Sequence, residues 1–204
     1  MSHRPRTDQR LRTLLAQECA RLITDEGVQD FRTAKRKAAL RLAVSDRAVL
    51  PDNREIEQAL LDRQRLFDAD RQQTRLRDLR ETALHAMQFL ARFRPRLVGS
   101  VLSGAAGPHA VIHLHLFADA PEDLTLFLLE RHIPFETAEH RLKMADGALV
   151  ALPAFRFTAG ETGIDLTVFG PLAEREAPLS TVNGRPMHRA ALAEVQALLA
   201  EPLS

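Results

Sequence analysis

Three polar side chains stand in stretches that alternate between apolar and polar residues. In residues 111–117, V-I-H-L-H-L-F, the alternation predicts a strand on which His113 and His115 share one face. In residues 163–169, G-I-D-L-T-V-F, the same pattern predicts a strand that carries Asp165. Two imidazoles and a carboxylate are suited to binding a transition-metal ion, to binding an anion or to transferring a proton. The alternative is an ordinary role as polar surface residues.

A group of small residues precedes the first of these strands. Gly99, Ser100, Ser103 and Gly104 can present backbone N–H groups and hydroxyls to a phosphate. The same residues also suit a plain turn of the chain, and both interpretations stay open. The sequence has no G-x-x-x-x-G-K-[ST] loop, so a P-loop enzyme is not indicated.

The glycine-serine pair, followed about a dozen residues later by two polar residues at i and i+2 of a strand, resembles the nucleotidyltransferase fold of the DNA polymerase β superfamily. In that family the serine turn holds nucleotide phosphates, and two carboxylates on the second strand carry divalent metal ions. A third carboxylate lies on a late strand, and Asp165 matches its position. Here His113 and His115 replace the paired carboxylates, so the resemblance implies a degenerate member.

Three alternatives for function follow, of which the resemblance implies the first two. Neutral imidazoles are poor ligands for Mg²⁺, so the first is a nucleotide, nucleic-acid or partner-binding module without standard magnesium-dependent transfer. The second is a divergent nucleotidyltransferase that uses His113, His115 and Asp165 as ligands to a divalent metal ion, with Asp165 in the catalytic role. The third is a scaffold whose amphipathic helices mediate dimerisation.

The elements around these residues predict an α+β core. We expect a short strand at Leu97 and Val98, a glycine-bearing turn and the strand of residues 111–117. A helix is expected to begin at Pro121. Further elements are expected as strands over residues 133–141, 149–158 and 163–169 and a helix over residues 189–200. The sheet is therefore expected to be mixed and mostly antiparallel, with about five strands and flanking helices.

The N-terminal part predicts a bundle of three or four helices. Apolar residues at three-and-four spacing indicate one helix over residues 7–25 and another from Asp30 through Val44. A third helix is expected after a cap at Asp52 or Asn53, with a break near residues 68–70. The last helix is expected to end before Pro95. We therefore predict a helical region over residues 1–94 and a nucleotidyltransferase-like core over residues 95–204.

Charge and cysteine content restrict the partners of the protein and the compartment in which we expect it. Residues 1–96 hold 21 Lys and Arg against 14 Asp and Glu, whereas the rest holds 7 against 13. The basic N-terminal helices are therefore expected either to be solvated or to contact a nucleic acid. No apolar stretch is long enough to span a membrane, and we expect a cytoplasmic protein. The single Cys19 excludes an internal disulfide and is expected to be a core residue.

Overall fold

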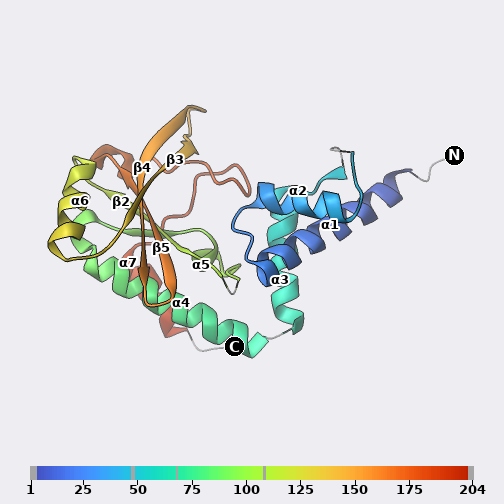
Figure 1. The fold of residues 1–204 in the computed structure, drawn as a ribbon, viewed down its shortest axis with the longest axis horizontal. Coiled ribbons are helices and arrows are strands. Elements are labelled where there is room, and N and C mark those ends of the chain that lie inside the picture. The colour runs from blue at the N-terminus through green and yellow to red at the C-terminus, as the bar shows by residue number, and fades with distance from the viewer. Residues whose placement is uncertain (1–3, 47–48, 68, 108, 202–204) are drawn as a thin grey trace. The chain divides into compact units, whose positions relative to one another are not determined.

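The structure is a computed structural model that describes residues 4–46, 49–67, 69–107 and 109–201. In these residues it has seven α-helices and one five-stranded sheet, so the predicted α+β class, with helices preceding the sheet, is confirmed (Figure 1). The helices are α1 (Arg4–Glu26), α2 (Phe31–Arg41), α3 (Asn53–Phe67), α4 (Ala69–Phe89), α5 (Ser100–Ser103), α6 (Pro121–Glu130) and α7 (Leu192–Ala200), with 3₁₀ helices η2 (Ala91–Phe93) and η3 (Pro171–Glu174). The strands are β1 (Arg96–Val98), β2 (Ile112–Phe117), β3 (Glu136–Lys143), β4 (Leu149–Ala159) and β5 (Thr162–Phe169).

The chain forms two compact units. The helical unit comprises Met1–Gln72, Ala105–Ala110 and Thr181–Asn183, and the sheet unit comprises Gln73–Gly104, Val111–Ser180 and Gly184–Ser204. This division differs from the predicted boundary after residue 94. Most of α4 belongs to the sheet unit, because apolar residues on its C-terminal part, among them Ala83 and Met87, are fully buried there.

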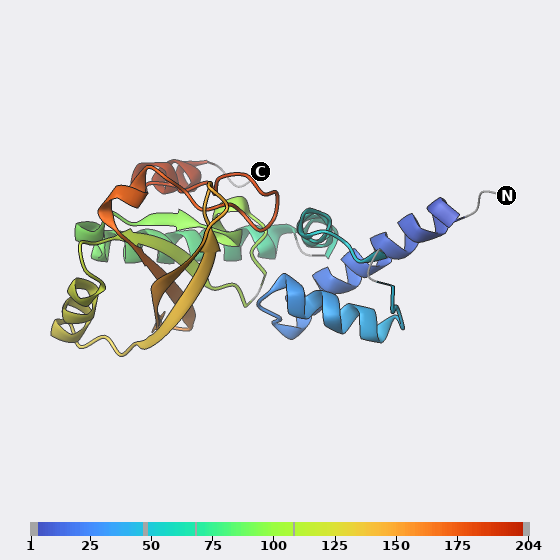
Figure 2. The ribbon, with the colours of Figure 1, turned by 90° about the horizontal axis from the view of Figure 1, so that it is seen from above.

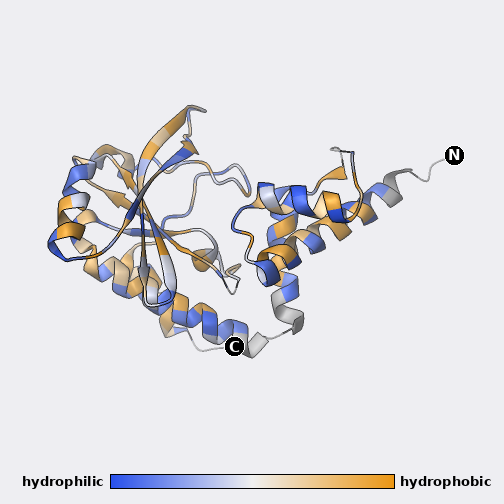
Figure 3. Ribbon diagram, in the orientation of Figure 1, coloured by the Kyte–Doolittle hydropathy of each residue, from blue (hydrophilic) through white to orange (hydrophobic). Residues whose placement is uncertain are grey.

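Helices α1, α2 and α3 share the core of the helical unit. Its fully buried side chains include Leu15 and Cys19 of α1, Ala38 of α2 and Ile56 of α3. Apolar and polar residues alternate around these helices in Figure 3, as amphipathic packing requires. Burial raises the pKa of Cys19 to about 11, so this cysteine is a packed apolar residue rather than a reactive thiolate.

The helix ends follow local capping chemistry. Asp30 caps α2 by accepting a hydrogen bond of 2.8 Å from the Thr33 N–H. Before α3, the side chains of Asp52 and Glu55 each accept from the other's backbone N–H, also at 2.8 Å, which is a capping box. Helix α2 ends at Arg41, earlier than the expected Val44, because the backbone turns at Ala43 with φ +52°.

The region between Asn53 and Phe89 holds two helices. Helix α3 ends at Phe67 and α4 begins at Ala69, which fits the predicted break, while Asp68 itself lies outside the described residues.

No helix within the described residues has both the length and the apolar character needed to cross a membrane.

The five strands are ordered β1-β2-β5-β4-β3. Strands β2 and β5 pair in parallel, and the other three pairs are antiparallel. The prediction of a mixed, mostly antiparallel sheet of five strands is therefore confirmed. The parallel pair joins the two strands that carry the predicted site residues, although they are about fifty residues apart in the sequence.

The two faces of the central strands differ in chemistry. One face carries apolar side chains that are almost fully inaccessible, namely Ile112, Leu114, Leu116, Ile164, Leu166 and Val168. The C-terminal part of α4 lies beside the sheet in both views (Figures 1 and 2), and its Phe89 ring lies 5.1 Å from that of Phe127 on α6. The opposite face of these strands carries His113, His115, Asp165 and Thr167, which belong to the candidate site, and ends in Phe117 and Phe169.

Candidate functional site

The pairing of three strands brings the predicted site residues onto one face. His113 on β2 is the register partner of Asp165 on β5, and His115 is the partner of Thr167. On the other side of β5, Asp165 pairs with Arg156 of β4. Register partners point to the same side of a sheet. The structure therefore places both histidines, the aspartate and an arginine in adjacent positions.

Asp165 is a buried carboxylate with a cationic partner. Its Oδ2 accepts a hydrogen bond of 2.8 Å from the Nε of Arg156, and its Oδ1 lies 3.3 Å from the Nε2 of His140 on β3. Burial alone would raise the pKa of Asp165, but the contacts with His140 and Arg156 outweigh it and lower that pKa below its ordinary value. The carboxylate is therefore ionised at neutral pH and held by the hydrogen bond from Arg156.

Arg156 has donors left over after this pairing. Its side chain is 53% exposed, while that of Asp165 is 5% exposed. A second nitrogen, Nη2, lies 3.4 Å from the His140 Nε2. Within the part of the chain that the structure describes, the remaining N–H donors of its guanidinium have no hydrogen-bond partner. The only carboxylate directly across the strand pair on β3 is Glu136, which is exposed and makes no ion pair with Arg156 within the described residues.

His140 is fixed from two sides. Its Nδ1 shares a hydrogen bond of 2.8 Å with the Thr167 hydroxyl, and its Nε2 faces Asp165. Thr167 and Asp165 are two residues apart on β5, so their side chains lie on the same face. The imidazole of His140 contacts both of them. His140 thus lies against the carboxylate that orients Arg156, although within the described residues the Asp165 Oδ1 has no hydrogen-bond partner.

His115 is a buried neutral histidine. Arg189 donates a hydrogen bond of 3.0 Å from its Nε to the His115 Nδ1, so the imidazole proton lies on Nε2. Burial, assisted by the positive charge of Arg189, lowers the pKa of His115 to about 3. His115 therefore accepts a hydrogen bond in this structure and carries no charge at neutral pH.

Arg189 links the polar face to the segment that crosses from β5 to α7. Its Nη1 donates to the carbonyl oxygens of Ala173 at 2.7 Å and Glu176 at 3.3 Å. Its guanidinium carbon lies 4.5 Å from the ring centre of Phe169. The next residue, Ala190, pairs with Leu97 of β1 through two backbone hydrogen bonds of 2.9 Å. Arg189 thus holds this crossing segment against the sheet.

The glycine-serine turn adjoins His113. Gly99 has φ +77°, a conformation that favours glycine, and a Cβ placed on it would lie 3.6 Å from the His113 Cδ2. Ser100 follows as the first residue of α5. Burial lowers the pKa of His113, although the charge of Asp165 acts in the opposite direction. The expected neighbourhood of turn, histidines and aspartate is therefore present on one face.

The four residues of the predicted phosphate-binding group lie around one short helix. The chain forms one turn of helix, α5, where we expected only a turn; Gly99 and Ser100 lie at its N-terminal end and Ser103 and Gly104 at its C-terminal end, and the Ser103 N–H donates to the Gly99 carbonyl oxygen at 3.0 Å. Gly104 lies at the other end of α5, where a Cβ would come within 4.0 Å of Arg80. Arg80 donates hydrogen bonds of 3.2 Å to the carbonyl oxygens of Val101 and Leu102. Gly99 is the residue of this group that adjoins His113.

The donor set does not fit the two magnesium ions of the superfamily that the sequence resembles. His113, His115 and Asp165 share a face, but Asp165 is paired with Arg156 and the Nδ1 of His115 is bonded to Arg189. A divalent cation beside Asp165 would be repelled by the guanidinium, and imidazoles replace the oxygen ligands that Mg²⁺ prefers. Across the described residues, no group of three or more His, Cys, Asp and Glu side chains is arranged to hold a metal ion. The predicted ligand set is therefore not assembled.

Asp119, a carboxylate that follows the strand of the two histidines in the sequence, does not replace the paired carboxylates of the superfamily that the sequence resembles. It is exposed and lies two residues beyond the end of β2. Since His113 is the register partner of Asp165, six residues of extended chain, about 20 Å, separate Asp119 from the level of the aspartate. Asp119 could therefore act beside Asp165 only if the chain after β2 turned back along the sheet.

Sequence reasoning missed two residues of the site, Arg156 and His140. Arg156 stands between Phe155 and Phe157 in an alternating stretch, so it was recognisable as a lone cation on the polar face of a strand. His140 had a weaker signal, because exposed polar residues surround it on β3. No family model matches the sequence, and no curated protein and no solved structure matches the chain.

Proposed function

We propose that the sheet unit is a nucleotidyltransferase-like module that binds the phosphate groups of a nucleotide without magnesium-dependent transfer. The proposal assigns the anion to Arg156 on the polar face, beside the Gly99–Ser100 turn. Asp165 and His140 are positioning residues in this proposal, and no catalytic step is assigned to them.

The order of the elements supports the proposed relationship. A helix, β1, the glycine-serine turn, β2 and α6 follow one another, and β5 returns to pair in parallel with β2. This is the order that the resemblance to the polymerase β superfamily implies. The hairpin of β3 and β4 lies between α6 and β5 in the sequence and contributes Arg156 and His140.

The state of Arg156 is the observation that carries the proposal. A guanidinium held by one carboxylate, half exposed and with free N–H donors, is preorganised to bind a phosphate in a bidentate manner. In the family, metal ions neutralise the phosphates. In this chain Arg156 supplies positive charge on the same face, adjacent to the carboxylate that matches a family ligand.

The spacing suits a ligand with several phosphate groups. The register places Val98, His113, Asp165 and Arg156 in one row across four strands. Three strand spacings correspond to about 14 Å between the Cα atoms of Val98 and Arg156. The side chain of Arg156 extends back toward Asp165, so a nucleoside triphosphate has the length to contact both the turn and the guanidinium.

Calorimetric titration with the four nucleoside triphosphates, in EDTA and in Mg²⁺, tests the proposal. We expect saturable binding that persists in EDTA, because the protein's own cation neutralises the ligand. Arg156→Gln is expected to weaken binding at least tenfold. Arg156→Lys is expected to weaken it less, since lysine keeps the positive charge but loses the paired N–H donors that bind a phosphate in a bidentate manner. Arg141→Gln on β3 is the matched control, because Arg141 is 77% exposed and lies outside the cluster.

Three results would contradict the proposal. The first is that no triphosphate binds measurably. The second is that Arg156→Gln and the wild type bind with equal affinity. The third is that the protein incorporates nucleotides in a reaction that requires Mg²⁺. Unfolding midpoints of all variants at pH 7 check that a loss of binding is not a loss of folded protein.

A further inference from the structure

Helix α2 carries a concentration of positive charge on its outer side. Its eleven residues, F-R-T-A-K-R-K-A-A-L-R, include five basic residues and no acidic one. The opposite side, with Ala34 and Ala38 fully buried, packs into the core of the helical unit. Burial of one side fixes which cations face solvent.

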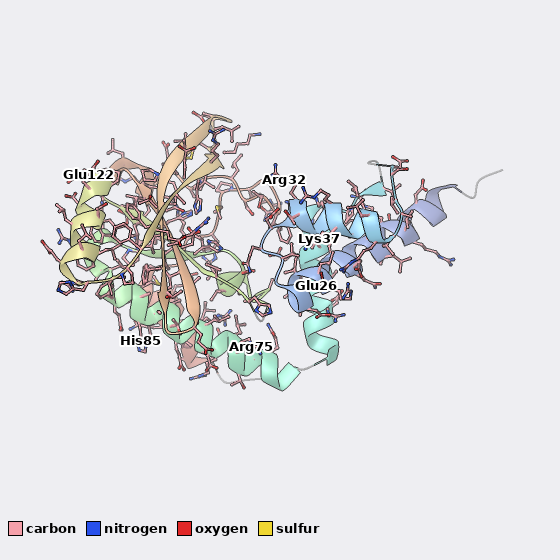
Figure 4. All side chains as sticks on the ribbon, in the orientation of Figure 1. Glu26, Arg32, Lys37, Arg75, His85 and Glu122 are labelled. Atoms are coloured by element: carbon pink, nitrogen blue, oxygen red, sulfur yellow. The ribbon has the colours of Figure 1, made fainter. Side chains whose placement is uncertain are left out.

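Three of these cations are exposed and form no ion pair. Arg32, Arg36 and Lys37 are exposed, and within the described residues none of them has a salt-bridge partner. We call these three residues the α2 basic face; Arg32 and Lys37 are labelled in Figure 4. Arg41 is different, because it donates to Glu26 at 2.7 Å and to Glu18 at 3.2 Å.

Acidic groups near α2 leave the face positive. Glu18 and Glu26 are already paired with Arg21 and Arg41. Asp30 lies at the N-terminus of α2, where its carboxylate accepts from the Thr33 N–H. It neutralises part of the charge of the adjacent Arg32, so Arg36 and Lys37 are the more strongly available pair.

The arrangement of the face fits a row of phosphates. Arg32 and Arg36 are four residues apart and therefore lie one above the other, about 6 Å apart at their Cβ atoms. Lys37 lies on the other flank, and Leu40, which is 76% exposed, lies between the two flanks. A helix with cations on both sides of a narrow strip matches the charged backbone of a nucleic acid.

A membrane surface is a poorer match. A helix that lies in a lipid interface needs a broad apolar face to bury. The apolar face of α2 is already inside the helical unit, and Leu40 is the single large apolar residue in the middle of its exposed side. We therefore propose that the α2 basic face binds the phosphate backbone of a nucleic acid, independently of the nucleotide site proposed on the sheet unit.

The test measures binding of the full chain to 30-nucleotide single-stranded and double-stranded RNA and DNA between 50 and 300 mM salt. Neutralised phosphates give a linear fall of the logarithm of the binding constant with the logarithm of salt concentration. Arg36→Gln/Lys37→Gln is expected to reduce this slope by about 1.5 and to weaken binding roughly tenfold at low salt. Arg36→Lys/Lys37→Arg, which keeps both charges, is expected to bind as the wild type does.

The controls separate this surface from other sources of charge. Arg141→Gln/Arg175→Gln removes two exposed cations from the sheet unit and is expected to leave the slope within experimental error. Titration of ATP into Arg36→Gln/Lys37→Gln is expected to match the wild type, so failure of one site is distinguishable from failure of the other. Absence of salt-dependent binding, an unchanged slope in the α2 variant, or binding to vesicles containing phosphatidylserine but to no nucleic acid would each overturn the proposal.

Discussion

The Nε of Arg156 lies 2.8 Å from the Oδ2 of Asp165, joining a half-exposed cation to an almost fully buried anion. The two residues face each other across the β4–β5 pair. A buried carboxylate needs a partner, whereas the guanidinium reaches water with its other nitrogens. Asp165 therefore determines where Arg156 points without using all of its hydrogen-bonding capacity.

Asp165→Asn distinguishes an arginine site from a metal site. The asparagine oxygen can still accept from Arg156, so removing the negative charge is expected to tighten triphosphate binding in EDTA by roughly threefold, the effect of one unit charge about 7 Å away in water-like surroundings. A site that depends on carboxylate ligands to a cation would instead bind only in the presence of Mg²⁺ and would lose that binding in the variant. Calorimetric titration measures the affinity, and Glu136→Gln provides a second removal of charge from the same face. A loss of affinity in both variants would contradict the role of Arg156.

The buried neutral state of His115 predicts a loss of stability in mild acid. The ordinary pKa of histidine in an unfolded chain is about 6.5, and that of His115 in the folded protein is about 3. Between these values the unfolded state binds more protons, so the free energy of unfolding falls as pH falls. One such group costs about 2 kcal/mol between pH 7 and pH 5. Urea unfolding at a series of pH values measures this slope.

His115→Asn isolates the share of His115 in this slope. The asparagine oxygen lies where Nδ1 was and can accept from Arg189, but it does not titrate. The variant is expected to be less stable at pH 7, because it is smaller, and to lose less stability toward pH 5. His113, whose pKa is also lowered, still contributes in both proteins. An identical slope in variant and wild type would contradict a neutral buried His115.

Arg189→Gln is expected to loosen the segment between β5 and α7. The substitution removes the donors to Ala173, Glu176 and His115, at a cost of about 2 kcal/mol in the free energy of unfolding. Hydrogen exchange at the amide of Ala190, which bonds to Leu97, is expected to accelerate before that of the central strands. NMR titration is expected to show a higher pKa for His115, because a positive charge has left its side. Arg175→Gln on the exposed end of η3 is the control.

The features of single strands were predictable from the sequence. The alternation around His113 and His115 depends only on the two-residue period of a strand, and both histidines share a face with Asp165 as expected. The start of α6 at Pro121 and the cap at Asp52 also depend on neighbouring residues alone. Local chemistry therefore predicted where most elements begin and which side of β2 and of β5 carries the polar residues.

Relations between distant strands were not predictable. Which residue of β4 faces Asp165 depends on the register of a hairpin, and a shift by one residue would replace Arg156 with a phenylalanine. The short helix α5 was also missed, because four residues are too few for a periodic pattern. The arginine that pairs with Asp165, and hence the poor fit to magnesium, became visible only with this register.

Gly99→Ala tests whether the turn beside His113 needs its left-handed conformation. At φ +77° an alanine is strained, and its Cβ would lie 3.6 Å from the His113 ring, an ordinary contact. The expected loss of about 1 to 2 kcal/mol in the free energy of unfolding therefore comes from the backbone and not from a clash. Gly170→Ala is the matched control, because Gly170 has φ −65° and nothing within 4 Å of its added Cβ, so its stability should be unchanged or slightly higher. Equal unfolding midpoints for the two variants would show that the backbone at Gly99 can adopt another conformation at no cost. The turn would then not be held in place beside His113.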